Sequence, residues 1–151
     1  MSKKFLVGVD GSDQAWKALD LATDFANLSG AELIIIHVIP YEPTPEAFRQ
    51  VAQAEGISVE ESSARYHFEK SIGDAITEEA EARARKNGVA KITTRVSEGR
   101  PANEIIALAH SRKADIIFLG SRGASDLAGL FLGSISHKVM HLAPCTCVIV
   151  R

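Results

Sequence analysis

The chain has 151 residues, of which 46% are hydrophobic and 24% are charged, and this composition predicts a single globular domain spanning residues 1–151. The chain has 17 Lys and Arg and 19 Asp and Glu, so its net charge is -2. This charge argues against nucleic acid and membrane surfaces as partners. No apolar run has the length of a signal peptide or a membrane span, so the expected location is cytoplasmic.

Strand and helix patterns alternate from the first residues onward. The apolar run Phe5 to Val9 predicts a strand that ends at Asp10. Apolar residues then recur at helical spacing, which predicts a helix with Ser12 or Asp13 as its N-cap and Gly30 as its stop. The residues expected on its inward face are Ala15, Ala18, Leu19, Ala22, Phe25 and Ala26.

A nearly continuous apolar run over 33–39 predicts a second strand that is covered on both faces, as in a parallel sheet. The stretch 41–56 predicts a loop with one short amphipathic helix at 48–52. Ser58 and Glu61 match a capping box, which predicts a long helix that ends at Asn87 and Gly88. The residues expected to face inward from this helix are Phe68, Ile72, Ala75, Ile76 and Ala80.

The second half of the chain continues the alternation with strands at 92–96, 116–119 and 146–150. One helix begins at Pro101, where proline suits the first turn, and another begins at Ser134. Parallel strands joined by helical crossovers predict an α/β fold, a three-layer doubly wound sandwich around a five-stranded parallel sheet. Cys145 and Cys147 are two apart, so they point to one face of the last strand and do not bridge each other.

A glycine-rich segment, Gly120 to Ser134, joins the fourth predicted strand to the last predicted helix. Glycines let the backbone approach a ligand closely, and the amides at a helix start favour an anion. The segment therefore predicts a phosphate site. The chain has neither a Walker A loop nor the Gly-x-Gly-x-x-Gly start of a dinucleotide-binding fold, which argues against those two enzyme classes.

The glycine spacing Gly120-x2-Gly123-x9-Gly133-Ser134, together with Val9-Asp10-Gly11-Ser12 after the first strand, resembles the ATP-binding branch of the universal stress protein family. The Gly99-Arg100-Pro101 turn and the Pro-Cys-Thr-Cys-Val-Ile-Val-Arg ending add to the resemblance, which is weak over 41–70. The resemblance implies the strand order 3-2-1-4-5, ATP with Mg²⁺ as the ligand, and a ligand position at the carboxyl ends of the switch strands.

The resemblance also implies a role for individual residues. Asp10 and Gly120 meet the ribose, and the backbone of Val38 reads the adenine edge. The residues implied to line the phosphates are Gly123, Gly133, Ser134 and Ile135. Arg122, between two of the glycines, is a further candidate for phosphate contact or, alternatively, an exposed loop arginine.

Simpler interpretations of the same residues remain open. Asp10 can instead cap the following helix, Gly123 and Gly133 can be plain turn glycines, and Asp126 can be a solvated loop residue. The spacing of His137, His141, Cys145 and Cys147 allows a metal site, but the chain must turn between the histidines and Cys147, which favours core cysteines. His37 is expected to be a hydrogen-bonded core residue, whereas His67 and His110 are expected on helix surfaces.

No pattern indicates a hydrolytic or transfer centre, because no base is placed to orient water at a phosphate. The leading hypothesis is a nucleotide-dependent stress or signalling module with at most slow ATP hydrolysis. The alternatives are a slow ATPase or phosphotransferase, and an interaction protein that does not depend on nucleotide. The last strand, 146–150, is predicted at an open sheet edge, which together with the resemblance implies a homodimer joined through that strand.

Overall fold

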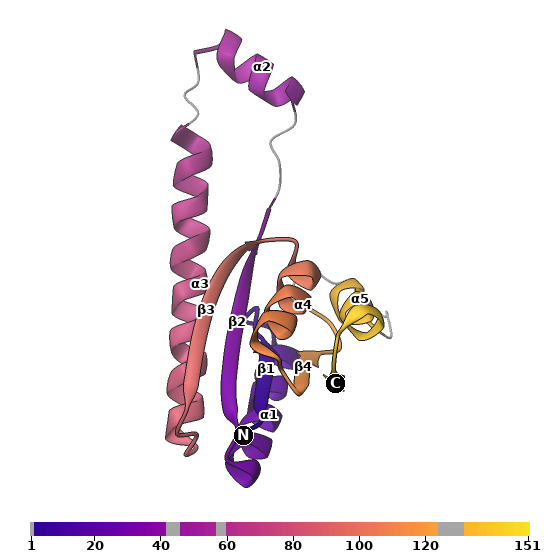
Figure 1. Cartoon of the computed structure of the whole chain (residues 1–151). Coiled ribbons are helices and arrows are strands. Elements are labelled where there is room, and N and C mark those ends of the chain that lie inside the picture. Colours follow the sequence, from indigo (N-terminus) through magenta and orange to yellow (C-terminus); the bar gives the residue numbers. More distant parts are fainter. Residues whose placement is uncertain (1, 42–45, 57–59, 124–131) are drawn as a thin grey trace.

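The computed structural model describes residues 2–41, 46–56, 60–123 and 132–151. Five parallel strands form one sheet in the order β3-β2-β1-β4-β5, which confirms the predicted order (Figure 1). The strands are β1 (Lys4–Gly8), β2 (Glu32–Pro40), β3 (Ile92–Gly99), β4 (Ile116–Gly120) and β5 (Thr146–Val150). The helices are α1 (Asp13–Ser29), α2 (Glu46–Ala54), α3 (Glu60–Lys86), α4 (Pro101–Arg112) and α5 (Ser134–Leu142).

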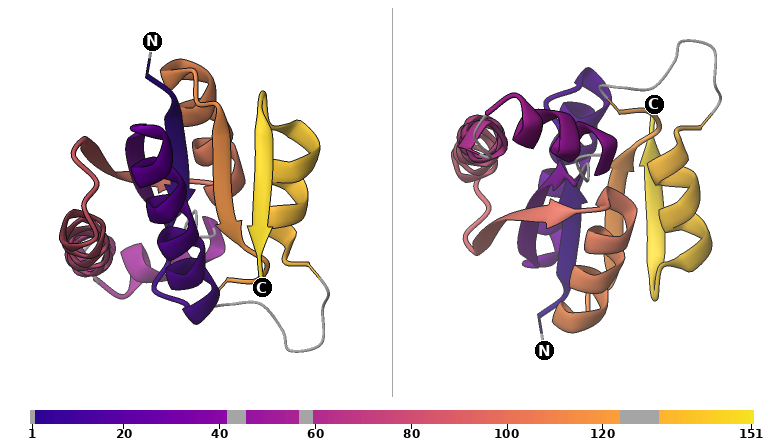
Figure 2. Two further views of the ribbon diagram at one scale, coloured as in Figure 1. Left: turned by 90° about the horizontal axis from the view of Figure 1, so that it is seen from below. Right: turned by 90° about the horizontal axis from the view of Figure 1, so that it is seen from above.

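The sheet lies between two helical layers, as the end views in Figure 2 show. Alternate residues of β1 serve the two layers: Phe5 and Val7 belong to the core under α1 and α3, and Leu6 belongs to the core under α4 and α5. The prediction of a three-layer sandwich is therefore confirmed. None of the helices in the described part of the chain is both long and apolar enough to cross a membrane.

Helix α1 begins and ends where its sequence predicts. Ser12 is the N-cap, and its Oγ accepts a hydrogen bond from Ala15 N at 3.3 Å. Gly30 ends the helix with a left-handed φ of 66°. Five of the six predicted inward residues are buried, but Phe25 is 42% exposed, although its ring makes an edge-to-face contact with that of Phe118 at 5.7 Å.

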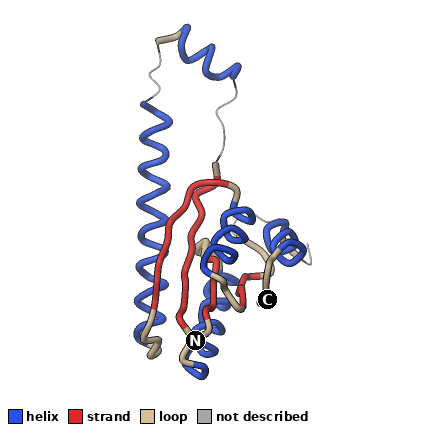
Figure 3. The backbone as a smooth tube through the Cα atoms, in the orientation of Figure 1, coloured by secondary structure: helices blue, strands red, loops and turns tan. Residues whose placement is uncertain are grey.

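Helix α3 turns only part of its predicted inward face to the sheet. Phe68 is 67% exposed, Ile72 is 44% exposed and Ala75 is exposed, so those three predictions are wrong. Ala80 is buried and Ile76 is half-buried against the core, as predicted. The fully buried residues in the described part of the helix are all small: Gly73, Thr77, Ala80 and Ala84. Small side chains let the helix axis lie close to β2 and β3, and the larger apolar residues are left on the outer face. Helix α3 continues past the ends of the strands toward α2 (Figure 3).

An ion cluster occupies the amino-terminal end of β2, away from the predicted ligand site. The Glu32 side chain is 3% exposed, and Arg112 Nη2 lies 2.6 Å from its Oε1. Thr93 Oγ1 donates to the same carboxylate at 2.9 Å, and Lys91 Nζ lies 3.5 Å away. Burial by itself raises the pKa of Glu32, but the Thr93 hydrogen bond and the two cations outweigh burial and hold the pKa below its usual value. The sequence predictions did not include this cluster.

Candidate functional site

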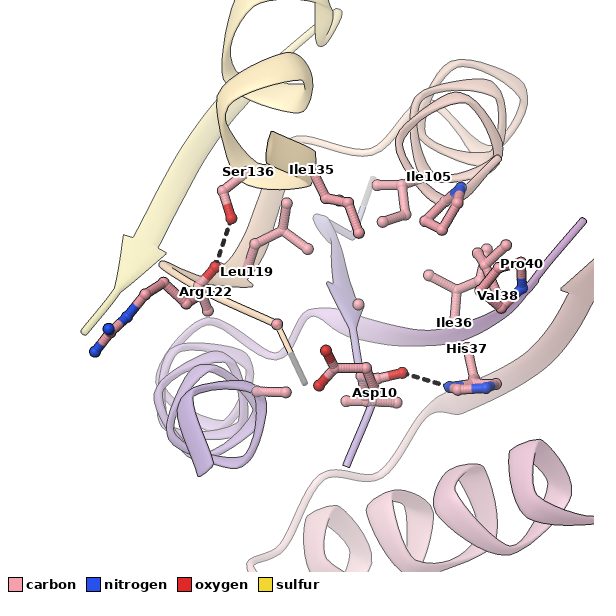
Figure 4. Close-up of a pocket in the computed structure, with 16 residues that line it drawn as sticks. Asp10, Ile36, His37, Val38, Pro40, Ile105, Leu119, Arg122, Ile135 and Ser136 are labelled. Atoms are coloured by element: carbon pink, nitrogen blue, oxygen red, sulfur yellow. Dashed lines mark hydrogen bonds between the residues drawn. The ribbon is translucent and has the colours of Figure 1, made fainter. Parts of the chain in front are cut away.

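A pocket of about 290 Å³ opens where β1, β2 and β4 end (Figure 4). In the sheet, β2 pairs with one edge of β1 and β4 pairs with its other edge, so the strand order reverses direction at β1. The crevice lies at this switch point. Strand ends supply its floor, and α4 and α5 contribute one wall each through Ile105 and Ile135. The pocket therefore lies where open α/β sheets bind their ligands.

Six of the eight predicted binding residues line this pocket: Asp10, Val38, Gly120, Arg122, Gly123 and Ile135. Gly133 and Ser134 do not line it, although both are close in sequence to residues that do. Gly133 is the N-cap of α5, and its N–H donates to Ser121 O at 2.6 Å. Ser134 is the exposed first residue of α5. The middle of the glycine-rich segment, 124–131, which includes Asp126, lies outside the described residues.

Asp10 lies two residues beyond the end of β1 and does not cap α1. Its Oδ1 accepts from Ser12 N at 2.9 Å, whereas the N-cap hydrogen bond of the helix is made by Ser12 itself. This local turn fixes the carboxyl group at the pocket, between the strand end that carries Arg122 and the His37 side of β2 (Figure 4). The helix-capping interpretation of Asp10 is therefore wrong.

Packing against α1 requires a glycine at position 120, a role that the sequence did not predict. A Cβ at this position would lie 2.7 Å from Gln14 Cβ, 2.9 Å from the Gln14 carbonyl carbon and 3.0 Å from Ala15 N. The first turn of α1 therefore rests directly on the end of β4. This contact brings the beginning of α1, the Asp10 turn and β4 together around one cavity.

Arg122 lies at the rim, and its guanidinium points away from Asp10 in Figure 4. Ser136, one turn into α5, is a lining residue that the sequence predictions missed. Its Oγ donates to Gly120 O at 2.6 Å and so fixes the first turn of α5 against the end of β4. The helix N-cap is a glycine without a side-chain cap hydrogen bond, so among the described residues no cap side chain occupies the first-turn amides of α5, which could face an anion.

The rest of the lining is mainly apolar. Ile36, Val38 and Leu119 come from strand ends, and Ile105 and Ile135 face them from the helices. Pockets with apolar walls and a few polar groups suit a flat heterocycle that needs only edge recognition. Val38 and Ile135 were predicted at the ligand, whereas the apolar strand patterns containing Ile36 and Leu119 do not distinguish a pocket wall from the core.

The chain matches the universal stress protein family model over residues 1–151. It belongs to the universal stress protein family. Universal stress protein YxiE of Bacillus subtilis is 39% identical to it over all of both chains. Among solved structures, UspA of Lactobacillus plantarum is 25% identical with a TM-score of 0.73, and the alignment covers 99% of this chain and 97% of that one. Another universal stress protein, solved in complex with cAMP, is 31% identical with a TM-score of 0.69 over 99% and 97% of the two chains.

The histidines and cysteines of this universal stress protein do not form a metal centre within the described ranges, where no group of three or more suitable side chains could hold an ion. His137 and His141 share a helix face with ring centroids 4.6 Å apart. Cys145 and Cys147 are free and half-buried, and burial raises the pKa of both thiols. His67 and His110 are exposed, as expected. His37 is hydrogen-bonded, as expected, but it is half-buried and lines the pocket.

Proposed function

We propose that this universal stress protein binds ATP together with Mg²⁺ at the switch-point pocket and acts as a nucleotide-dependent stress or signalling module. The observation that carries the proposal is the convergence of Asp10, Val38 and Gly123, from separate segments, on one pocket of about 290 Å³. The 31% identical relative solved with cAMP supports an adenine nucleotide as the ligand class.

The pocket suits the nucleoside part of such a ligand. Small-ligand pockets span about 300–1,000 Å³, so the adenine and ribose match this volume while the phosphates extend beyond it. In the proposed pose, Ile36 and Ile105 pack on the faces of adenine, and the backbone of Val38 reads its edge. The Asp10 carboxylate accepts hydrogen bonds from the ribose hydroxyls, which is the chemistry a charged acceptor performs best.

The phosphates then lie toward Gly123, Gly133 and the beginning of α5. Backbone amides of this region and the positive end of the helix dipole stabilise their charge, and Ile135 borders them. The exposed hydroxyl of Ser134 is placed to reach a phosphate oxygen or Mg²⁺. The metal ion would neutralise phosphate charge, and hydroxyl and phosphate oxygens are the hard ligands that Mg²⁺ prefers.

Calorimetric titration of Asp10→Asn tests the ribose assignment. Asparagine still accepts from Ser12 N, so the local turn survives while the charge is lost. We expect ATP affinity to fall about tenfold, the worth of one charge-assisted hydrogen bond. For 2′,3′-dideoxy-ATP the same substitution should change affinity far less. The control is Asp20→Asn, which makes the same change on the exposed face of α1. Equal ATP affinity in wild type and Asp10→Asn would contradict the assignment.

We also propose a homodimer joined through β5. Strand β5 lies at the sheet edge, with Cys147 and Ile149 packed on one face and Val148 and Val150 on the other. Its backbone therefore offers one open row of hydrogen-bonding groups between two apolar faces, a surface that recruits another strand. Antiparallel pairing with a second copy about a two-fold axis would close that row.

A further inference from the structure

At the pocket, the hydrogen-bonded ladder between β1 and β2 ends with a side-chain contact in place of a backbone hydrogen bond. The parallel ladder pairs Gly8 with Ile36, and it extends one step further, since Val9 N donates to Ile36 O at 2.9 Å. In a continued parallel ladder, the next hydrogen bond would run from Val38 N to Val9 O. Across the described residues no backbone hydrogen bond joins those two atoms. Val9 O is paired instead with the side chain of His37, whose Nδ1 lies 2.8 Å away.

This contact fixes the protonation state of one ring nitrogen. A carbonyl oxygen only accepts, so Nδ1 of His37 must carry the proton it donates. The ring is confined from the opposite side by α3, because a Cβ at Gly73 would lie 2.8 Å from His37 Cδ2 and 3.4 Å from its Nε2. The glycine inside α3, a residue that weakens a helix, is explained by the room this ring needs. Helix α3 thus holds the imidazole against the end of β1.

The backbone of Val38 is affected directly. Successive residues of a strand direct their N–H and C=O groups to opposite neighbours, so Val38 faces the same side as Ile36, whose carbonyl is bonded to Val9. At the level of Val38, β1 has already ended, and the space on that side belongs to the pocket that Val38 lines. Since His37 supplies the hydrogen bond to Val9 O, the N–H of Val38 has no partner on β1 among the described residues and can serve a ligand.

We infer that His37 is a positioning residue for base specificity: its imidazole takes the place of the Val38 amide at Val9 O and so keeps that amide directed into the pocket. This inference rests on the proposed nucleotide function. Adenine offers an acceptor at N1 beside an amino donor at position 6, which matches a backbone N–H and C=O. Hypoxanthine presents the reverse pair, so a pocket edge built on the Val38 backbone rejects inosine nucleotides.

Three substitutions at His37 separate the position of the donor from the mere presence of a polar group. His37→Asn keeps a nitrogen at the distance of Nδ1 from the backbone, His37→Gln moves the amide outward to the position of Nε2, and His37→Leu has no donor. In His37→Leu the unpaired Val9 carbonyl is expected to recruit the Val38 amide, the next donor in the ladder.

The first measurement needs no ligand. In the wild-type protein, ¹⁵N NMR should find the neutral His37 ring protonated at Nδ1, and the Val38 amide should exchange with solvent faster than the Ile36 amide. In His37→Leu the Val38 amide should become protected about tenfold, in His37→Gln likewise, and in His37→Asn it should behave as in wild type. A wild-type ring protonated only at Nε2, or equal Val38 exchange in wild type and His37→Leu, would overturn the inference.

The second measurement is the ratio of the Kd values for ITP and ATP. We expect the preference for ATP to fall about tenfold in His37→Leu and to be retained in His37→Asn. An unchanged preference in His37→Leu would overturn the specificity role. A wild-type protein that binds no adenine nucleotide would overturn the proposed function and the specificity role with it, while the exchange measurement still decides whether His37 replaces Val38 at Val9 O. Should His37→Leu fail to fold, Gly73→Ala, which crowds the same ring, serves as the second variant and should increase Val38 protection.

Discussion

Replacing Gly120 by alanine is the most direct test of how the pocket is assembled. The added Cβ would lie within 3.0 Å of three atoms of Gln14 and Ala15, and two of those atoms belong to the backbone of α1. Backbone atoms cannot rotate away as a side chain can, so either α1 or the end of β4 must move. Overpacking of this kind lowers the free energy of unfolding by about 1–3 kcal/mol. The upper half of that range applies here because the added Cβ clashes with backbone atoms of the helix.

Thermal and urea unfolding measure the cost. For a chain of this size each kcal/mol corresponds to about 2–4 °C, so Gly120→Ala should lower Tm by about 4–12 °C. Gly30→Ala is the matched control, because a Cβ there meets no atom within 4 Å and only the left-handed φ of 66° opposes it. That conformation costs about 1–2 kcal/mol. If Gly120→Ala unfolds at the wild-type temperature, α1 does not rest on β4 as described and the packing explanation of Gly120 is refuted.

Three further predictions concern stability, chemistry and assembly. Glu32→Gln should cost about 1–3 kcal/mol at neutral pH, because it removes the charge that Arg112 and Lys91 face. Since folding lowers the pKa of Glu32 from its usual value of 4.5, this stability is present above pH 4.5 and is lost as pH falls through the folded pKa. Equal differences between variant and wild type at pH 3 and pH 7 would contradict that explanation. Phosphate release from ATP, followed over hours, should be far slower than the roughly 1–10³ s⁻¹ of typical enzymes. Steady turnover at such rates would favour the enzyme hypothesis instead. Ile149→Pro should yield monomers in light scattering whereas Ile149→Ala stays dimeric, and a monomeric wild type at high micromolar concentration would refute the homodimer.

The position of that proline follows from the register of β5. Ser121 N donates to Val150 O at 2.7 Å, so Val150 and, by alternation, Val148 direct their backbone groups to β4. A proline at Val148 would therefore break the sheet from within. The outward N–H groups belong to Cys147 and Ile149. A proline at either position removes a hydrogen bond to the proposed partner strand and leaves those to β4 intact.

Local signals in the sequence were sufficient for the type and order of the secondary-structure elements, whereas the position of the ligand site came from the resemblance and stays a prediction. The apolar runs, the Ser12 cap and the Gly30 stop act over a few residues, so the boundaries of α1 could be predicted from neighbours alone. The helical crossovers between apolar runs predicted a parallel sheet, and the strand order that the resemblance implied placed its switch point between β1 and β4. Strand ends were less accurate: β3 runs to Gly99 rather than residue 96, because pairing with β2 extends it through polar residues.

The tertiary structure decided which residues meet. Helix α3 turns Gly73 and Thr77 to the sheet because small residues permit a close approach, a property that hydrophobic periodicity cannot measure when Phe68 and Ile72 lie nearby. The same holds for Gly120, whose missing side chain makes room for α1, and for Ser136, which lines the pocket where Ser134 was expected. Such contacts join segments distant in sequence, so only the packed chain determines them.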